Sequence, residues 1–200
     1  MGIAERKIRQ KEEVRTSILN VAWQIVTEEG WQALSIRKIA EAIEYSVPVI
    51  YDHFANKEAI LYELTKQGFN SLNQQLTKAQ KRSTHPEKQL EDMAHAYWEF
   101  AFDNKAQYQV MYGLGIPSCE TVLQIPEIGS FTDLVTQPIK ELITKNKNTT
   151  ADPLLKLQTF WSMLHGLVSI NMMNNNEHKQ ELNQRVIQDF ISGFISGIKA

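Results

Sequence analysis

The stretch LSIRKIAEAIEYSVPVIYDHFANK, residues 34–57, has the pattern of two short helices joined by a tight turn. Ser35 is placed to cap the first helix. The apolar residues after it are spaced three and four apart, which puts them on one helical face; they are Ile36, Ile39, Ala40 and Ile43. Glu44 and Tyr45 then form the connection to the second helix.

The second helix is expected to begin at Val47, with the hydroxyl of Ser46 accepting a hydrogen bond from a backbone amide of the first turn. Pro48 fits there because the first turn needs no donor from it. Ile50 and Phe54 should face the core. The remaining side chains of the helix are left outside, and they are Val47, Val49, Tyr51 and His53. This is the arrangement of a helix-turn-helix DNA-binding protein.

The same stretch resembles the DNA-binding domain of the TetR/AcrR family of transcriptional regulators. The matching positions are Ala22, Gly30, Trp31, Ser35, Ile39, Ala40, Ser46, Ile50, Tyr51, Phe54, Lys57 and Glu58. Two positions depart from the family pattern: Glu44 replaces the usual turn glycine, and Asp52 is an acid inside the recognition helix. A turn with a positive φ would strain Glu44, because its side chain disfavours that backbone conformation.

The resemblance implies a homodimeric repressor that binds double-stranded operator DNA and is released by a small-molecule effector. It also implies an all-α fold of about nine helices. We expect the DNA-binding domain over residues 1–57, a linking helix from about 57 to 79, and a ligand-binding and dimerisation domain over 80–200. Trp161, His165 and Gly166 further resemble the Trp-His-Gly signature of one class of TetR carboxy-terminal domains.

Helical periodicity continues along the whole chain. In the first helix an apolar stripe precedes Gly30, which is placed to end the helix; its members are Val14, Ile18, Val21, Ala22, Ile25 and Val26. Asn56 can cap the linking helix. Further helices are expected near 87–103, 105–113, 130–147, 152–173 and 178–198. The stretch between Gly113 and Gly129 should be the longest irregular segment.

Composition fits a globular chain: 42% of the 200 residues are hydrophobic, and the formal net charge is −2. The small negative charge is unusual for a DNA-binding protein, but basic residues outnumber acidic ones in the first fifteen positions. These charges either attract phosphates or belong to a solvated helix start. Cys119 is alone, and no signal peptide or membrane-spanning stretch is evident. We therefore expect a cytoplasmic protein without a membrane segment.

Arg37 is the strongest candidate for a base contact, because a guanidinium can bind guanine O6 and N7 together. Lys38 is a weaker one. Val47, Pro48 and Val49 can contact thymine methyl groups, whereas Tyr51 and His53 can reach phosphate oxygens. Ser46 serves as a helix cap, a phosphate ligand, or both. Lys57 adds a cation at the start of the next helix.

A carboxy-terminal set of aromatic, thioether and imidazole groups can line an apolar ligand pocket, or it can form an ordinary core. Its members are Tyr97, Trp98, Phe102, Tyr108, Met111, Tyr112, Trp161, His165 and Met172. The last two helices carry more apolar surface than one small bundle needs, which predicts a four-helix homodimer contact. The candidate contact residues are Trp161, Leu164, Val168, Phe190, Gly193, Phe194 and Gly197.

An enzyme and a helical adaptor are the two other classes of protein to which an all-helical chain could belong. For an enzyme we find no paired acids at metal spacing, no nucleophile motif and no phosphate-binding loop, so we expect no catalytic residues, no metal and no cofactor. The alternative is a helical adaptor that contacts protein instead of DNA, or a ligand-binding protein without sequence-specific DNA binding, and the modest basicity leaves it open. DNA binding that weakens steeply with salt would separate the regulator from the adaptor.

Overall fold

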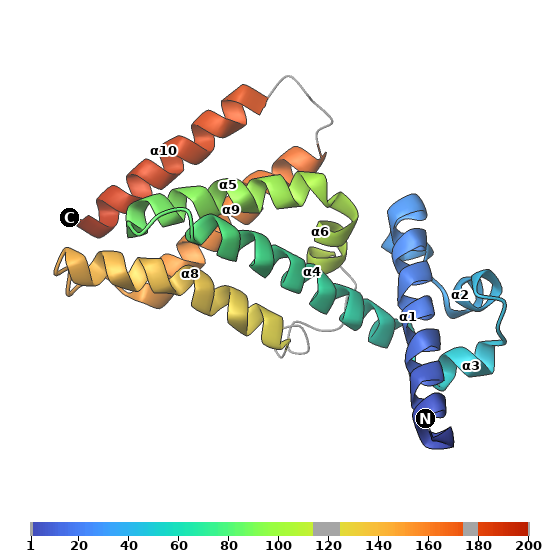
Figure 1. Ribbon diagram of the computed structural model, residues 1–200. Helices are drawn as coiled ribbons and strands as arrows, with labels where there is room; N and C mark the ends of the chain where they lie inside the picture. Colours follow the sequence, from blue (N-terminus) through green and yellow to red (C-terminus); the bar gives the residue numbers. More distant parts are fainter. Residues whose placement is uncertain (1, 114–124, 174–179, 200) are drawn as a thin grey trace. The chain divides into compact units, whose positions relative to one another are not determined.

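The computed structural model describes residues 2–113, 125–173 and 180–199 (Figure 1). These residues form nine α-helices and one short 3-10 helix, with no strand among them, which confirms the predicted all-α class. The helices are α1 Ile3–Glu29, η1 Trp31–Ala33, α2 Ile36–Ala42, α3 Val47–Tyr51, α4 Lys57–Gln80, α5 Pro86–Asp103, α6 Lys105–Tyr112, α8 Pro126–Lys145, α9 Pro153–Met173 and α10 Gln180–Lys199.

The chain divides into two compact units. The first unit holds residues 1–68 together with a later segment that begins at Ala106, and the second holds Phe69–Lys105 and Ile125–Ala200. Helix α4 therefore contributes its first half to one unit and its second half to the other. Helix α6 belongs by packing to the first unit, whereas the sequence-based division grouped it with residues 80–200.

The core of the first unit is made by aliphatic residues from several helices. Ile18 and Ala22 of α1, Ile39 of α2 and Ile50 of α3 are all fully buried. Val110 of α6 joins the same cluster at 0% exposure. The apolar stripe expected on the first helix is confirmed for its buried members, and Gly30 ends α1 with a φ of 87°.

The second unit is a bundle in which α5, α8, α9 and α10 contact one another. Phe131 of α8 lies at its centre, with its ring centroid 6.3 Å from Phe69 and 5.0 Å from Trp161. At one end of the bundle, Glu87 of α5 accepts hydrogen bonds or ion pairs from Lys145 at 3.0 Å and Lys199 at 3.1 Å. One carboxylate thus links three helices.

The pKa of Glu87 is lowered from 4.5 to about 2. The largest cause is a hydrogen bond from its own backbone N–H at the start of α5, followed by the two lysines, and together these outweigh the opposing effect of burial. Elsewhere in the bundle, Asn183 of α10 donates to Asn171 of α9 at 2.8 Å. Asn183 is 8% exposed, so this pair is a buried polar link between the last two helices.

One expectation for the second unit was wrong. The segment near 113–129 is not irregular throughout, because α8 begins at Pro126, whose missing N–H is tolerated in a first turn; residues 114–124 lie outside the described residues. On α10, Ile187, Ile191, Phe194 and Ile198 are buried, whereas Leu182 and Val186 are 53% and 37% exposed.

Candidate nucleic-acid interface

Helix α2 begins as the sequence predicts. The hydroxyl oxygen of Ser35 accepts a hydrogen bond from the backbone N–H of Lys38 at 3.2 Å, which satisfies one amide of the first turn. Ile39 and Ala40 are buried and fix the inner face of the helix. Arg37 and Lys38 are consequently held on the outer face, where both are exposed.

The turn after α2 requires the conformation that favours glycine. Glu44 has a φ of 59°, and the backbone N–H groups of Glu44 and Tyr45 donate to the carbonyls of Glu41 and Ala40. This double closure is the Schellman motif, in which the residue at the Glu44 position takes a left-handed backbone. The departure from the family pattern therefore places a strained residue at the junction of the two helices.

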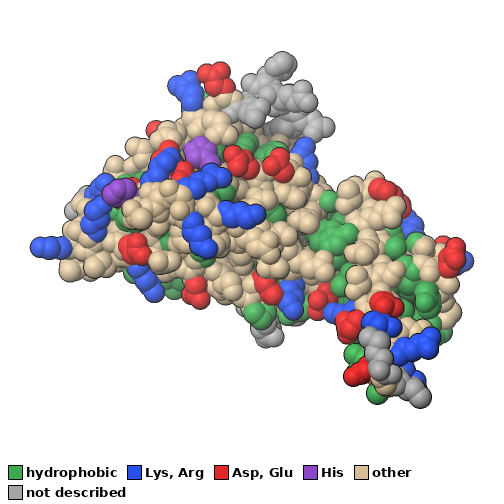
Figure 2. Space-filling model, viewed as in Figure 1, with side chains coloured by type: hydrophobic (Ala, Val, Ile, Leu, Met, Phe, Trp, Pro, Cys, Tyr) green, Lys and Arg blue, Asp and Glu red, His purple; other side chains and the backbone are tan. Residues whose placement is uncertain are grey.

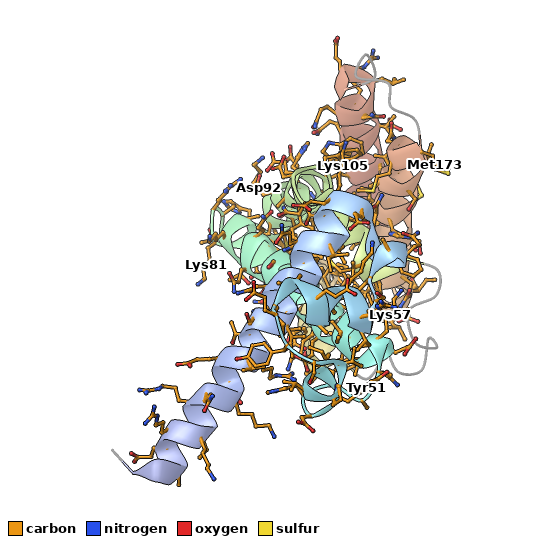
Figure 3. All side chains as sticks on the ribbon, turned by 90° about the vertical axis from the view of Figure 1, so that its right-hand side faces the viewer. Tyr51, Lys57, Lys81, Asp92, Lys105 and Met173 are labelled. Atoms are coloured by element: carbon orange, nitrogen blue, oxygen red, sulfur yellow. The ribbon has the colours of Figure 1, made fainter. Side chains whose placement is uncertain are left out.

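Helix α3 is short, and one buried residue anchors it. Ile50 is 0% exposed, and Phe54 just beyond the helix is 3% exposed, as predicted. Ser46 occupies the position before the helix, but its hydroxyl makes no capping hydrogen bond, so the predicted side-chain cap is wrong. The outer side of the helix presents Val47 at 36% exposure and Tyr51 at 53% (Figure 3). Pro48 is exposed beside them, and Val49 is half-buried.

Both basic residues of α2 are paired with acids. The Nε of Arg37 lies 3.0 Å from Oε1 of Glu41, one turn further along the helix. The Nζ of Lys38 lies 2.6 Å from Oε2 of Glu29, at the end of α1. Exposed pairs of this kind are worth at most about 1 kcal/mol, so a base or a phosphate can replace either acid. The Arg37 pair could have been read from the i,i+4 spacing, whereas the Lys38 pair depends on how α1 meets α2.

The remaining predicted contacts are more constrained. Lys57 is half-buried, and its Nζ donates to the backbone carbonyl of Gln32 at 3.2 Å. Its neighbour Asn56 caps α4 by accepting from the N–H of Ala59 at 2.8 Å, as predicted. His53 is also half-buried, and its Nδ1 atom is buried with no hydrogen-bond partner among the described residues.

Tyr45 is a residue of this surface that sequence reasoning assigned only to the turn. It is 45% exposed and immediately precedes α3, next to Val47. An exposed aromatic ring in a tight turn has no evident packing role, and this is the signal that could have identified it. The surface defined by α2, the turn and α3 thus joins paired cations to exposed apolar groups, a mixture suited to reading base edges.

The ligand-pocket candidates are divided between the two units. In the second unit, Tyr97 and Trp161 line a narrow apolar space that is too small to hold a water molecule. The other residues around this space are Leu76, Met93, Phe131, Val135, Phe160 and Leu164. Trp98 is buried and stacks on Phe102 with ring centroids 4.4 Å apart, so these two pack against each other.

The rest of the ligand candidates have other surroundings. Burial lowers the pKa of His165 below its ordinary value of 6.5, and Met172 is half-buried on α9. Tyr108, Met111 and Tyr112 lie on α6 in the first unit, where the Tyr108 and Tyr112 ring centroids are 4.6 Å apart. Met111 lies so close to Gly68 that a Cβ at residue 68 would approach its Sδ to 2.7 Å.

The dimer candidates differ in how much surface they offer. Leu164, Val168 and Phe194 are at most 7% exposed, so they are occupied inside the protomer. Trp161 and Phe190 are half-buried. Gly193 and Gly197 are exposed, and a Cβ added at Gly193 would meet no atom within 4 Å. Exposed apolar residues that were not predicted lie on the same two helices: Leu154, Leu155, Met163, Ile170, Met173, Leu182 and Val186.

The described residues contain no group of three or more His, Cys, Asp or Glu side chains placed to hold a metal ion. None of the described helices is long and apolar enough to cross a membrane.

Comparison with protein families gives two matches. The model of bacterial regulatory proteins of the tetR family matches residues 18–64. The model described as a tetracyclin repressor-like carboxy-terminal domain matches residues 90–190, more than half of the 200-residue chain. Together they include α2 and α3 in the first unit and most of the second unit.

Individual relatives are more distant. The HTH-type transcriptional regulator HbdR of Aromatoleum sp. (strain CIB) is 29% identical over 89 residues, which is 44% of this chain and 38% of that protein. The uncharacterized HTH-type transcriptional regulator YobS of Bacillus subtilis (strain 168) is 23% identical over 189 residues, covering 89% and 91% of the two chains. The crystal structure of the transcriptional regulator FadR from Bacillus subtilis in complex with stearoyl-CoA shares the fold with a TM-score of 0.74, at 18% identity over 91% of this chain and 98% of that one.

Proposed function

This chain belongs to the TetR family of DNA-binding transcriptional regulators, and we propose that it is a homodimeric repressor that a small, mostly apolar ligand releases from a palindromic operator. The observation that carries the proposal is the exposed face of α2 and α3, whose inner residues are buried while Arg37, Val47 and Tyr51 remain outside. We propose no catalytic activity and a cytoplasmic location, where the operator would be.

Arg37 is the proposed base reader. Its guanidinium is bound through Nε to Glu41, which leaves the terminal nitrogens available for guanine O6 and N7. Val47, Pro48 and the neighbouring Val49 are proposed to contact thymine methyl groups. Tyr51, Lys57, Ser46 and His53 are proposed to contact phosphates. One such face spans only a few base pairs, so two faces in successive major grooves, roughly 34–36 Å apart, are needed for a specific site.

The proposed dimer joins α9 and α10 of two protomers. On α10 the exposed positions Leu182, Val186, Gly193 and Gly197 lie on one side of the helix, away from the buried Ile187 and Ile191. On α9, Met163 is 48% exposed beside Val186, across a shallow groove between the two helices. An apolar face of this kind with glycines is suited to close packing of four helices.

The proposed effector site is the apolar space around Tyr97 and Trp161 in the second unit. This space is too narrow to hold even a water molecule, so we expect its walls to move apart when a ligand enters. FadR of Bacillus subtilis is bound to stearoyl-CoA in its crystal structure, which makes acyl compounds the first effectors to test. A ligand that prefers the non-binding geometry would weaken operator affinity through a coupling of about 1–3 kcal/mol.

Selection of bound sequences from a random duplex pool tests the proposal. We expect an inverted repeat whose half-sites are separated by about one helical turn or a multiple of it. Arg37→Ala should relax preference at one base position, whereas Lys57→Ala should weaken binding to all sequences alike. Failure of the wild-type protein to enrich any sequence would refute the regulator and favour the adaptor.

A second experiment tests the effector site. Val135→Phe should add side-chain volume to the walls of this space, and it changes no residue of α2 or α3. With a labelled operator and a series of saturated fatty acids and acyl-CoA thioesters, we expect release of the wild-type protein by at least one compound and no release of the variant. Equal release of both proteins would place the effector elsewhere.

A further inference from the structure

We propose that the first three turns of α1 are a docking surface for DNA phosphates flanking each half-site, with Lys7 and Lys11 as the contacts. The proposal rests on the DNA-binding function. It adds to the α2–α3 face a second surface that binds DNA of any sequence.

This segment has no packing role in the described structure. Residues 4–13 of α1 are all exposed, including Ile8 at 66%, and full burial begins only at Ile18. These ten residues therefore extend beyond the core, about 15 Å of helix at 1.5 Å per residue. The segment runs clear of α2 and α3 in Figure 3.

One face of the segment carries a row of basic residues and no acidic residue. Lys7, Lys11 and Arg15 follow at intervals of four residues, so they form a row on one side of the helix. At about 100° per residue, each glutamate of the segment lies about 100° or more from Lys11; the glutamates are Glu5, Glu12 and Glu13. Among the described residues, no carboxylate is within ion-pair distance of Lys7 or Lys11.

The contacts of Arg15 show which side of α1 this row of basic residues occupies. Its guanidinium lies 4.4 Å from the ring centroid of Phe54 and 3.2 Å from Oε1 of Glu63. Phe54 lies three residues beyond the end of the recognition helix α3, so Arg15 joins α1 to the segment that follows that helix. Lys11 and Lys7 lie about one and two turns further along α1, about 6 and 12 Å away along its axis at 1.5 Å per residue. The two lysines therefore extend the DNA-reading surface beyond α3.

Charge complementarity identifies phosphate as the partner. Residues 1–68 contain nine Lys or Arg against ten Asp or Glu, and side chains of both signs lie on the face of this unit that Figure 2 shows. The cations of α2 are already paired with Glu41 and Glu29. Unpaired cations that share one face are thus found at the start of α1, and it is these that can release counterions from DNA.

The experiment compares two double variants with the same charge change. Lys7→Gln with Lys11→Gln removes the row, whereas Arg6→Gln with Arg9→Gln removes two cations from the other faces. Gln keeps a helix propensity close to that of Lys and Arg, and circular dichroism should confirm the helix in both. Affinity is measured on the selected operator as a function of salt, on a duplex trimmed to the operator and on one with long flanks.

On the long duplex we expect the Lys7/Lys11 variant to bind about 10- to 100-fold more weakly, with a salt slope flatter by about 3–4 for two lysines in each of two protomers. The Arg6/Arg9 variant should lose less than about threefold. On the trimmed duplex the wild type and the Lys7/Lys11 variant should bind alike.

Three results would overturn the proposal: equal losses in the two double variants, a wild type indifferent to flank length, or a change of oligomeric state in the Lys7/Lys11 variant. The third would mean that α1 contacts another copy of the chain. Absence of any selected operator for the wild type would instead refute the DNA-binding function itself, so the two failures can be told apart.

Discussion

The candidate functional side chains are exposed in the first unit and buried in the second. In the first unit, Val47 and Tyr51 stand outside a core closed by Ile39 and Ile50. In the second unit, Tyr97 is 2% exposed and belongs to the interior it is proposed to open. A DNA-reading surface can be rigid, because the duplex approaches from outside, whereas a buried effector site requires its own packing to change. The comparison suggests that the first unit recognises and the second unit responds.

The largest expected effect tests whether the two cores are energetically separate. Ile39→Ala in the first unit and Phe131→Ala in the second should each cost about 2–5 kcal/mol, because both side chains are at most 1% exposed. We expect scanning calorimetry to show each substitution lowering one of two transitions by about 10 °C or more. A single transition that both substitutions lower alike would mean that the units unfold together.

The next effect concerns the surface on which the second unit is proposed to dimerise. Val186→Asp places a charge in an apolar contact and should give a monomer with operator affinity at least about 100-fold weaker. Ser192→Asp, on the polar side of α10, is the matched control. Sedimentation equilibrium and operator titration should be measured on both variants. A Val186→Asp protein that remains dimeric would move the interface away from α9 and α10.

A third prediction uses the acid dependence of the second unit. The folded pKa of Glu87 is about 2, below its ordinary value of 4.5, so its stabilisation is complete above pH 4.5 and is lost as the pH falls towards 2. We expect the loss to be about 1–3 kcal/mol, because the side chain is partly exposed. In urea titrations at pH 2.5 and pH 6, Glu87→Gln should reduce this dependence. An unchanged dependence would assign it to other carboxylates.

The smallest expected effect compares one strained residue in each unit. Among the described residues, the positive φ values outside glycine belong to Glu44 at 59° and Lys147 at 54°. Glycine at either position should relieve the strain and stabilise its own unit by about 0.5–1 kcal/mol after the entropy cost of glycine. If Glu44→Gly stabilises the first unit but also weakens operator binding, the strain has a function at the junction of α2 and α3.

Much of the first unit was predictable because its residues act locally. Ser35 and Asn56 cap helices within three residues, and the doubt about Glu44 followed from the geometry of the turn itself. Ser46 sits at the predicted helix start without the predicted hydrogen bond, since a residue's position in a turn does not fix its hydroxyl rotamer. The pairing of Lys38 with Glu29 could not be foreseen, because it depends on the packing of two helices.

The second unit was less predictable for the same reason. Its helices were found from periodicity, but tertiary packing decides which apolar residues of α10 are buried inside the protomer and which stay exposed. The ligand candidates could not be separated from core residues, since a buried Tyr97 and a buried Trp98 read alike in sequence. The Trp-His-Gly assignment remains a prediction from the sequence.

The position of Val110 has a consequence for how the protein is made. This residue completes the core of the first unit, yet it lies on α6, after the whole of α5 has been synthesised. A nascent chain that has emerged only to Gly68 therefore lacks one buried member of this core cluster. Folding during translation usually proceeds from the amino terminus, but here that end must wait for a later segment. In a chimera that takes only residues 1–68 from a relative, the new core residues would pack against an α6 from a different protein. Helix α6 should therefore be exchanged together with residues 1–68.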